Sequence, residues 1–261
     1  MKYAIYQMDI IAGRPEENRK KVATWLDDVA NREQPDVVVL PEMWTTAYTL
    51  PELETNADIA GEPTISFLKE LAQKYNVNII GGSVANKKAD GIYNTAIVIN
   101  RAGELIHQYD KIHLVPMLDE PAYLTGGKEK VKTFTLDGVK MGLIICYDLR
   151  FPELARQLAL EGVQVLHIVA EWPTPRIDHW KALQVARAIE NQMFVVSSNR
   201  IGSYNDDSFG GSSMVVDPGG KTLILGSQTQ EETLVTELSI DLVDKMRKQV
   251  PVFSSRKPDF Y

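Results

Sequence analysis

The segment VKMGLIICYDLRFPE, residues 139–153, is the stretch around which the rest of the chain is organised. Its apolar part, residues 141–145, predicts a short strand, and the proline at position 152 is suited to the first turn of a helix. The only cysteine of the chain, Cys146, falls between the two. A thiol there lies at the end of a strand and near a helix N-terminus, whose dipole favours the thiolate. The pattern indicates a nucleophile, while a small buried core residue fits the same pattern equally well.

The composition limits the classes of protein to which the chain can belong. Its 261 residues contain no linker-like or strongly charged block, which predicts one domain over residues 1–261. The formal net charge of -7 argues against nucleic acid and anionic membranes as partners, because both require a basic surface. One cysteine excludes an internal disulfide, and we find neither a signal peptide nor an apolar run of about 20 residues. We therefore expect a cytoplasmic protein that does not bind a membrane.

The hydrophobic pattern predicts strands mixed with helices. Apolar runs, alternating or continuous, indicate strands at residues 2–9, 36–40, 77–83, 93–100, 104–109, 131–136, 141–145, 163–169, 193–198, 212–216, 221–225 and 233–240. Apolar residues at helical spacing indicate helices at residues 16–30, 65–75, 152–161, 179–191 and 241–249. Such a mixture is typical of an α/β fold in which two mixed sheets pack face to face and are covered by helices.

Three of the predicted strands end next to a residue whose side chain could take part in catalysis. Glu42 follows the strand that ends at residue 40, Lys111 follows the strand that ends at residue 109, and Cys146 follows the strand that ends at residue 145. In α/β sheets, ligands gather beyond the carboxyl ends of the strands. We therefore expect a carboxyl group, an ammonium group and a thiol to meet in one pocket.

A cysteine nucleophile needs a base, because a thiol with an ordinary pKa is mostly protonated at neutral pH. His113, just after a strand, is one candidate for a Cys–His pair. Glu42 is the other, because burial raises the pKa of a carboxyl group and suits it to accept and return a proton. Lys111 and the backbone N–H of Tyr147 could then stabilise the oxyanion of a tetrahedral intermediate. Taken one at a time, Glu42 is equally suited to cap a turn, and most lysines are solvated surface charges.

Four motifs resemble those of the carbon–nitrogen hydrolase (nitrilase) superfamily and occur in that family's order along the chain. They are LPEM at residues 40–43, YDKIHL at residues 109–114, GLIICYDLRFPE at residues 142–153 and ARAIEN at residues 186–191. The resemblance implies a four-layer α-β-β-α sandwich that usually dimerises through its helices. It also implies a Glu-Lys-Cys triad that works without a metal or an organic cofactor.

The resemblance assigns roles to individual residues. It implies that Glu42 is the general base and acid, Lys111 the oxyanion stabiliser and Cys146 the nucleophile. Glu120 lies in the long loop after the lysine, where many members of the family have a second glutamate that orients the triad and the substrate. From the residues alone, Glu120 is equally well a solvated loop carboxylate.

Further segments resemble the ω-amidase branch of the superfamily. These are YDLRFPE at residues 147–153, Tyr48, and AEWP at residues 170–173, followed by Arg176 and by His179 and Trp180. The branch hydrolyses the terminal amide of 2-oxo dicarboxylic acid monoamides, such as 2-oxoglutaramate, through a thioester with release of ammonia. The alternatives are N-carbamoyl compounds, aliphatic amides or a deaminated peptide amide as substrates, and a non-catalytic scaffold that keeps only the fold.

Several side chains are candidates for the walls of the substrate pocket. Trp44, Tyr48 and Trp172 could shape it, and core packing is an equal alternative for each. Arg176 is the candidate for the remote carboxylate of an anionic substrate, or for a surface pair with the nearby Asp178. We expect Arg150 to be structural and to pair within its own turn.

The C-terminal tail, residues 250–261, is rich in apolar residues but has no regular period. Such a tail needs a surface on which to pack, which is either the core of the same chain or a neighbouring subunit. We therefore expect a homodimer or a higher homo-oligomer that acts on a small amide.

Overall fold

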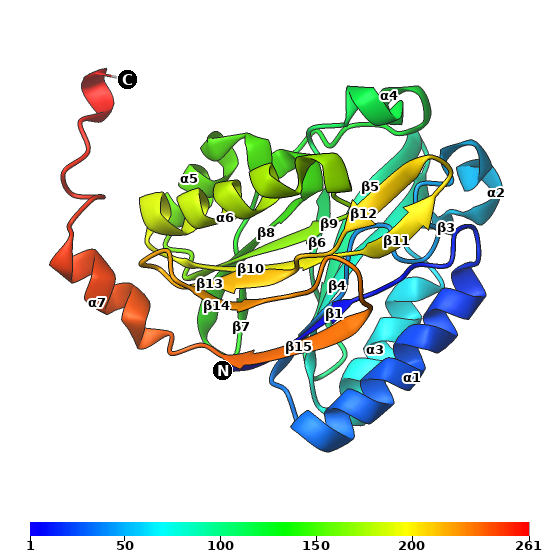
Figure 1. Cartoon of the computed structure of the whole chain (residues 1–261), viewed down its shortest axis with the longest axis horizontal. Helices are drawn as coiled ribbons and strands as arrows, with labels where there is room; N and C mark the ends of the chain where they lie inside the picture. The colour runs from blue at the N-terminus through cyan, green and yellow to red at the C-terminus, as the bar shows by residue number, and fades with distance from the viewer. Residues whose placement is uncertain (261) are drawn as a thin grey trace.

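The computed structural model describes residues 1–260, and its centre consists of two mixed β-sheets that lie face to face (Figure 1). The first sheet has seven strands in the order β15-β1-β2-β4-β5-β6, with β3 against β4. Its strands are β1 (Lys2–Gln7), β2 (Val37–Val39), β3 (Asp58–Ile59), β4 (Asn78–Lys88), β5 (Gly91–Ile99), β6 (Leu105–Asp110) and β15 (Glu232–Glu237).

The second sheet has six strands in the order β14-β13-β10-β9-β8-β7. They are β7 (Phe134–Leu136), β8 (Val139–Ile145), β9 (Val165–Ala170), β10 (Phe194–Asn199), β13 (Met214–Val216) and β14 (Thr222–Leu225). A separate hairpin consists of β11 (Ile201–Tyr204) and β12 (Asp207–Gly210). The sequence analysis did not predict this hairpin, because its strands are short and largely polar.

Helices cover the outer face of each sheet (Figure 1). The first sheet is covered by α1 (Pro15–Glu33) and α3 (Thr64–Tyr75), and the second by α5 (Pro152–Leu160) and α6 (Ile177–Asn191). The remaining helices are α2 (Leu53–Asn56), α4 (Glu120–Tyr123) and α7 (Asp241–Gln249). The predicted four-layer α-β-β-α sandwich is therefore confirmed.

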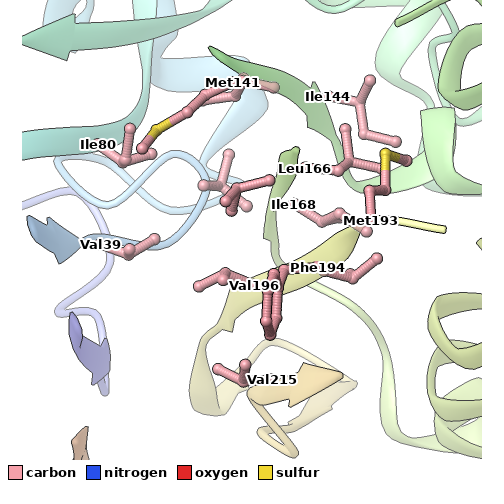
Figure 2. Close-up of a cluster of buried hydrophobic side chains, with 14 of the residues drawn as sticks. Val39, Ile80, Met141, Ile144, Leu166, Ile168, Met193, Phe194, Val196 and Val215 are labelled. Carbon is pink, nitrogen blue, oxygen red and sulfur yellow. The ribbon is translucent and has the colours of Figure 1, made fainter. Parts of the chain in front are cut away.

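The alternation of side chains along the strands separates two cores. On β1, Tyr3 and Ile5 point into the core between the two sheets, whereas Ala4 and Tyr6 belong to the core under α1 and α3. Figure 2 shows part of a buried cluster that combines the core between the sheets with the layer under α5 and α6, because successive residues of β8 and β9 point to opposite faces. The labelled residues are Val39, Ile80, Met141, Ile144, Leu166, Ile168, Met193, Phe194, Val196 and Val215.

A close backbone approach fixes the loop after β2. Gly82 has a φ of +60°, and a Cβ at this position would lie 1.9 Å from the carbonyl oxygen of Pro41. Only glycine is compatible with both constraints. A register shift in β4 near this glycine lets Ser83 donate its backbone N–H to the same Pro41 oxygen at 3.2 Å. The segment that carries Glu42 is thus held against the middle of β4.

The C-terminal tail extends beyond α7 and away from the body of the sandwich (Figure 1). Part of it packs on its own chain, because the Phe253 ring lies under the guanidinium groups of Arg156 and Arg247, at 5.6 and 5.1 Å. Phe260 is 84% exposed, and Tyr261 lies outside the described residues. Within residues 1–260, every helix is too short or too polar to cross a bilayer.

Candidate active site

Glu42, Lys111 and Cys146 meet at one end of the sandwich, as the ends of β2, β6 and β8 predicted. All three side chains are buried. The Nζ atom of Lys111 donates a hydrogen bond of 2.9 Å to Oε1 of Glu42. The Cys146 thiol lies close enough to Glu42 and Lys111 for both charges to shift its pKa. Residues that are far apart in the sequence therefore form one reactive cluster.

The two oxygens of Glu42 have different surroundings. Oε1 accepts hydrogen bonds from Lys111 at 2.9 Å and from Nδ2 of Asn94 at 2.7 Å, and it also lies 2.9 Å from the Tyr48 hydroxyl. Oε2 accepts one hydrogen bond, at 2.7 Å, from the backbone N–H of Glu171. Because Oε1 already faces three donors, Oε2 is the oxygen with a free lone pair for the thiol proton.

Glu120 completes this network from the first turn of α4. Its Oε1 atom accepts hydrogen bonds from Lys111 at 2.7 Å and from the Tyr48 hydroxyl at 2.5 Å. Its Oε2 atom accepts the backbone N–H of Val115 at 2.7 Å. Glu120 is completely buried, so the alternative of a solvated loop carboxylate is wrong.

The protonation of the cluster follows from its burial and its charges. Burial, and secondarily the negative charge of Glu42, raise the pKa of the Cys146 thiol well above its ordinary value, and Lys111 offsets this only in part. Burial alone would lower the pKa of Lys111, but Glu120 and Glu42 outweigh it and raise that pKa well above normal. The resting site therefore holds an ammonium and a neutral thiol. The expectation of a resting thiolate is not supported, because burial favours the neutral thiol.

The chain turns sharply at Cys146. Its φ is +46°, a left-handed conformation that is unusual for a residue with a side chain. A 3-10 helix, Cys146–Arg150, begins at this residue and precedes α5. The first N–H groups of a helix have no acceptor within the helix, and that of Tyr147 belongs to this first turn. The backbone thus offers a hydrogen-bond donor directly beside the sulfur.

A small pocket opens at Cys146. Its walls consist of Val115, Met117, Leu118, Cys146, Tyr147, Arg150, Trp172, Pro173 and Arg176. The guanidinium of Arg150 lies 4.7 Å from the centre of the Trp172 ring. Nε1 of Trp172 donates to the backbone carbonyl of Arg176 at 2.8 Å, which places the Arg176 segment beside the ring. Among residues 1–260, neither guanidinium takes part in an ion pair.

Trp172 and Arg176 thus line the pocket, whereas for Trp44 the alternative of core packing holds, and Tyr48 and Arg150 have other contacts than expected. Trp44 is fully buried in the core under α1 and α3, where its Nε1 donates to the carbonyl of Gly81 at 2.8 Å. Tyr48 bridges the charged cluster and also borders a second hollow next to the pocket. Arg150 does not pair within its own turn, because its guanidinium lies over the Trp172 ring instead.

The alternative of a Cys–His pair is not supported. Nδ1 of His113 lies 2.8 Å from Oδ1 of Asp148, and the His113 ring stacks on Phe151 with 3.5 Å between ring centres. The imidazole is therefore committed to other partners. Within residues 1–260, no group of three or more His, Cys, Asp or Glu side chains is arranged to hold a metal ion.

The sequence analysis missed three polar residues at the site. Glu171 follows β9, the strand next to β8, so the rule for strand ends could have located it. Its carboxyl group accepts a hydrogen bond of 2.9 Å from the buried Arg200 guanidinium. Asn94 lies within β5, where nothing in a single sequence distinguishes it from other strand residues. Asp148 and Glu171 were noted only as parts of motifs.

Comparison with known proteins agrees with this geometry. The carbon-nitrogen hydrolase profile matches residues 2–248. A 2-oxoglutaramate amidase from Bacillus subtilis is 43% identical over 263 residues, which cover 100% of both chains. A Staphylococcus lugdunensis protein called hydrolase in agr operon is 49% identical over 227 residues, covering 87% of this chain and 97% of that protein.

The structural comparison gives the same result. A nitrilase-superfamily protein from Saccharomyces cerevisiae superimposes with a TM-score of 0.90 and 29% identity, covering 98% of this chain and 96% of that one. The chain belongs to the carbon-nitrogen hydrolase family. It is therefore a hydrolase that acts on carbon–nitrogen bonds.

Proposed function

We propose that this enzyme is an ω-amidase, which hydrolyses the terminal amide of a 2-oxo dicarboxylic acid monoamide such as 2-oxoglutaramate and releases ammonia. Identity of 43% over the full length to a 2-oxoglutaramate amidase is the main support. The pocket adds a second argument, because it combines a buried thiol with two guanidinium groups that have no ion-pair partner within residues 1–260. Such a site suits a small amide that carries a carboxylate.

The first step forms a thioester. The sulfur of Cys146 attacks the amide carbon while Oε2 of Glu42 accepts the thiol proton. The two events are coupled, because the raised pKa of the thiol makes a free thiolate unfavourable. Glu42 then gives the proton to the amide nitrogen, the carbon–nitrogen bond breaks and ammonia leaves.

The negative charge on the substrate oxygen needs donors during this step. The backbone N–H of Tyr147 is one donor, and the Lys111 ammonium is the other. All three protons of that ammonium have partners in the resting site, and the longest of these contacts is the one to Tyr48, at 3.2 Å. We infer that the oxyanion takes over this weakest contact while both carboxylates keep theirs.

The second step releases the acid. Water attacks the thioester carbon, Oε2 of Glu42 accepts a proton from the water, and the carbon–sulfur bond breaks. The proton returns to the sulfur, so Cys146 and Glu42 end in their starting states. Glu120 holds Lys111 in place throughout, and needs no proton of its own to do so.

We assign the remote carboxylate of the substrate to Arg176, with Trp172 as the adjoining wall. A charge-assisted hydrogen bond is worth roughly 1.5–3 kcal/mol, or about 10- to 100-fold in affinity. Arg176→Gln should therefore raise KM for 2-oxoglutaramate by about that factor. Rates with a neutral amide such as butyramide, the matched control substrate, should change less than about threefold.

Ammonia release over a panel of substrates tests the assignment. The panel contains 2-oxoglutaramate, its four-carbon homologue, butyramide, propionamide and an N-carbamoyl amino acid. We expect the two 2-oxo acid amides to have by far the highest kcat/KM. Equal values for neutral amides, or faster turnover of the N-carbamoyl compound, would refute the ω-amidase proposal.

We also propose that the chain works as a homo-oligomer in the cytoplasm. Large apolar side chains remain exposed on neighbouring elements, namely Leu160 on α5, Ile189 on α6 and Phe260 in the tail. A reducing compartment would keep the one essential thiol from oxidation. Sedimentation velocity at micromolar protein concentration measures the assembly, and a monomer there would contradict it.

A further inference from the structure

Asp148 accepts four hydrogen bonds although it is completely buried. Its Oδ1 atom accepts the backbone N–H of His113 at 3.1 Å and faces Nδ1 of the same residue at 2.8 Å. Its Oδ2 atom accepts the Tyr109 hydroxyl at 2.7 Å and the backbone N–H of Ile145 at 3.2 Å. Because an ionised carboxylate only accepts, the His113 ring must place its proton on Nδ1.

The positions of these donors in the chain are informative. Tyr109 and His113 lie two residues before and two residues after Lys111, and Ile145 directly precedes Cys146. Asp148 itself follows Cys146 by two residues. One carboxylate therefore links the segment that carries the ammonium to the segment that carries the sulfur.

These two segments belong to different sheets. The backbone N–H of Lys111 bonds to the carbonyl of Asn94 on β5 in the first sheet, at 2.9 Å. Cys146 follows β8 in the second sheet. The separation of the ammonium from the sulfur thus depends on how the two sheets are joined at this end, and Asp148 joins them.

We propose that Asp148 is a positioning residue that fixes the Lys111 ammonium relative to the Cys146 sulfur, through Tyr109 and His113. The proposal rests on the proposed thioester mechanism, in which the ammonium stabilises the oxyanion. Misplacement of a catalytic group by about 1 Å can cost roughly 100-fold in rate. Four hydrogen bonds to one buried side chain, two of them from residues flanking the lysine, are suited to prevent such a shift.

Asp148→Asn is a sharp test. An amide offers one accepting oxygen, and its NH2 group would face the backbone N–H of either His113 or Ile145, which can only donate, so that hydrogen bond must break. We expect kcat to fall about 100-fold with KM within about threefold of the wild-type value. The rate is measured with the fastest substrate of the panel above, so that an error in the substrate assignment does not affect the result.

Alkylation of Cys146 by iodoacetamide distinguishes a misplaced Lys111 ammonium from a general loss of the folded site. Displacement of iodide by sulfur builds no oxyanion, so it does not need the Lys111 ammonium at the oxyanion position. In Asp148→Asn, alkylation should therefore slow less than about 10-fold while hydrolysis slows about 100-fold. Equal losses in both reactions, or an unchanged kcat, would overturn the proposal.

Asp110→Asn is the matched control. Asp110 adjoins Lys111 in the sequence, but its carboxylate accepts from Lys88 and Thr95 and makes no link to the Cys146 segment. We expect this variant to keep kcat within about threefold. A loss as large as that of Asp148→Asn would refute the specific role of Asp148.

A second variant decides the question if Asp148→Asn does not fold. Tyr109→Phe combined with His113→Phe keeps Asp148 and the aromatic packing on Phe151, but removes both side-chain donors of the lysine segment. The ratio of hydrolysis to alkylation should then fall about 10-fold. A wild-type ratio would overturn the proposal, whereas a wild-type enzyme that hydrolyses no panel amide would instead refute the proposed function.

Discussion

Two groups of buried polar side chains lie in this sandwich, one at its catalytic end and one in the middle of the core between the sheets. At the catalytic end, the ammonium of Lys111 lies between the carboxylates of Glu42 and Glu120 at 2.9 and 2.7 Å. In the middle, Tyr3 of the first sheet contacts His167 of the second, with 3.2 Å between Oη and Nε2. Both groups are excluded from water, but they differ in charge.

His167 is neutral because of its surroundings. Its Nδ1 lies 3.2 Å from the carbonyl oxygen of Gly142, which can only accept, so Nδ1 carries the proton and Nε2 accepts from Tyr3. Burial lowers the pKa of His167 to about 4. At the catalytic end each buried charge adjoins an opposite one, which keeps it. His167 has no such neighbour, so burial removes its charge.

Removal of one charge from the catalytic end should lower kcat more than any other change discussed below. Glu42→Gln retains the shape of the side chain but cannot accept the thiol proton. We expect kcat to fall by roughly 1,000- to 10,000-fold, the upper range for loss of a general base. Ammonia release measures the rate, and intact mass spectrometry should detect no thioester. A variant that keeps a tenth of the wild-type rate would show that another group acts as the base.

Glu171→Gln is the matched control for this prediction. Glu171 is equally buried and adjoins Glu42, but it contacts Glu42 only through its backbone N–H. Burial raises the pKa of Glu171 to about 8, so a glutamine resembles the protonated form that this carboxyl favours at pH 7. The control should lose less than about 10-fold in kcat. A similar loss of kcat in both variants would mean that catalysis depends on the total charge of the site and not on Glu42 as the base.

Removal of a neutral group from the same network should lower kcat by an intermediate factor. Tyr48→Phe deletes a hydroxyl that touches Glu42, Glu120 and Lys111 but carries no charge, because its pKa is raised well above normal by burial and by the neighbouring carboxylates. Hydrogen bonds to charged groups are worth roughly 1.5–3 kcal/mol, so kcat should fall about 10- to 100-fold. Steady-state kinetics at pH 7 measures this. A loss as large as that of Glu42→Gln would assign Tyr48 a direct part in the proton transfer.

The strand ends explain why much of the site could be predicted from the sequence. Predicted strands that end just before Glu42, Lys111 and Cys146 mark the same edge of the fold, and this information is local. The position of Trp44 could not be predicted, because a tryptophan beside a catalytic residue fits a pocket wall or a core equally well. Its burial depends on Phe67 of α3, which packs against it from a distant part of the chain.

The protonation of Cys146 could not be predicted for a similar reason. A helix N-terminus can be read from the sequence, but desolvation depends on every group that surrounds the sulfur. The four contacts of Asp148 likewise connect two distant segments. Local patterns thus predict which residues approach the site, whereas their charge states and connections depend on tertiary packing.

A substitution of His167, in the middle of the core, should have the smallest effect on kcat. It should instead change how the free energy of unfolding depends on pH. The pKa of His167 is about 4 in the folded chain and about 6.5 in the unfolded chain. Between these values the unfolded chain binds more protons, so stability is complete above pH 6.5 and is lost as the pH falls toward 4. From pH 7 to pH 5, this one residue should remove about 2 kcal/mol from the free energy of unfolding.

Urea unfolding of His167→Asn at both pH values measures this contribution, because the asparagine cannot titrate. Between pH 7 and pH 5, the free energy of unfolding of the variant should fall by about 2 kcal/mol less than that of the wild type. The kcat of the variant at pH 7 should stay within about twofold of the wild-type value. His107, whose pKa burial also lowers to about 4, titrates in the same window, so His107→Asn serves as the matched variant. If His167→Asn keeps the full wild-type loss, the imidazole is already charged in the folded core. The contrast between a charged catalytic end and a neutral middle would then fail, because the core would be tolerating an unpaired cation.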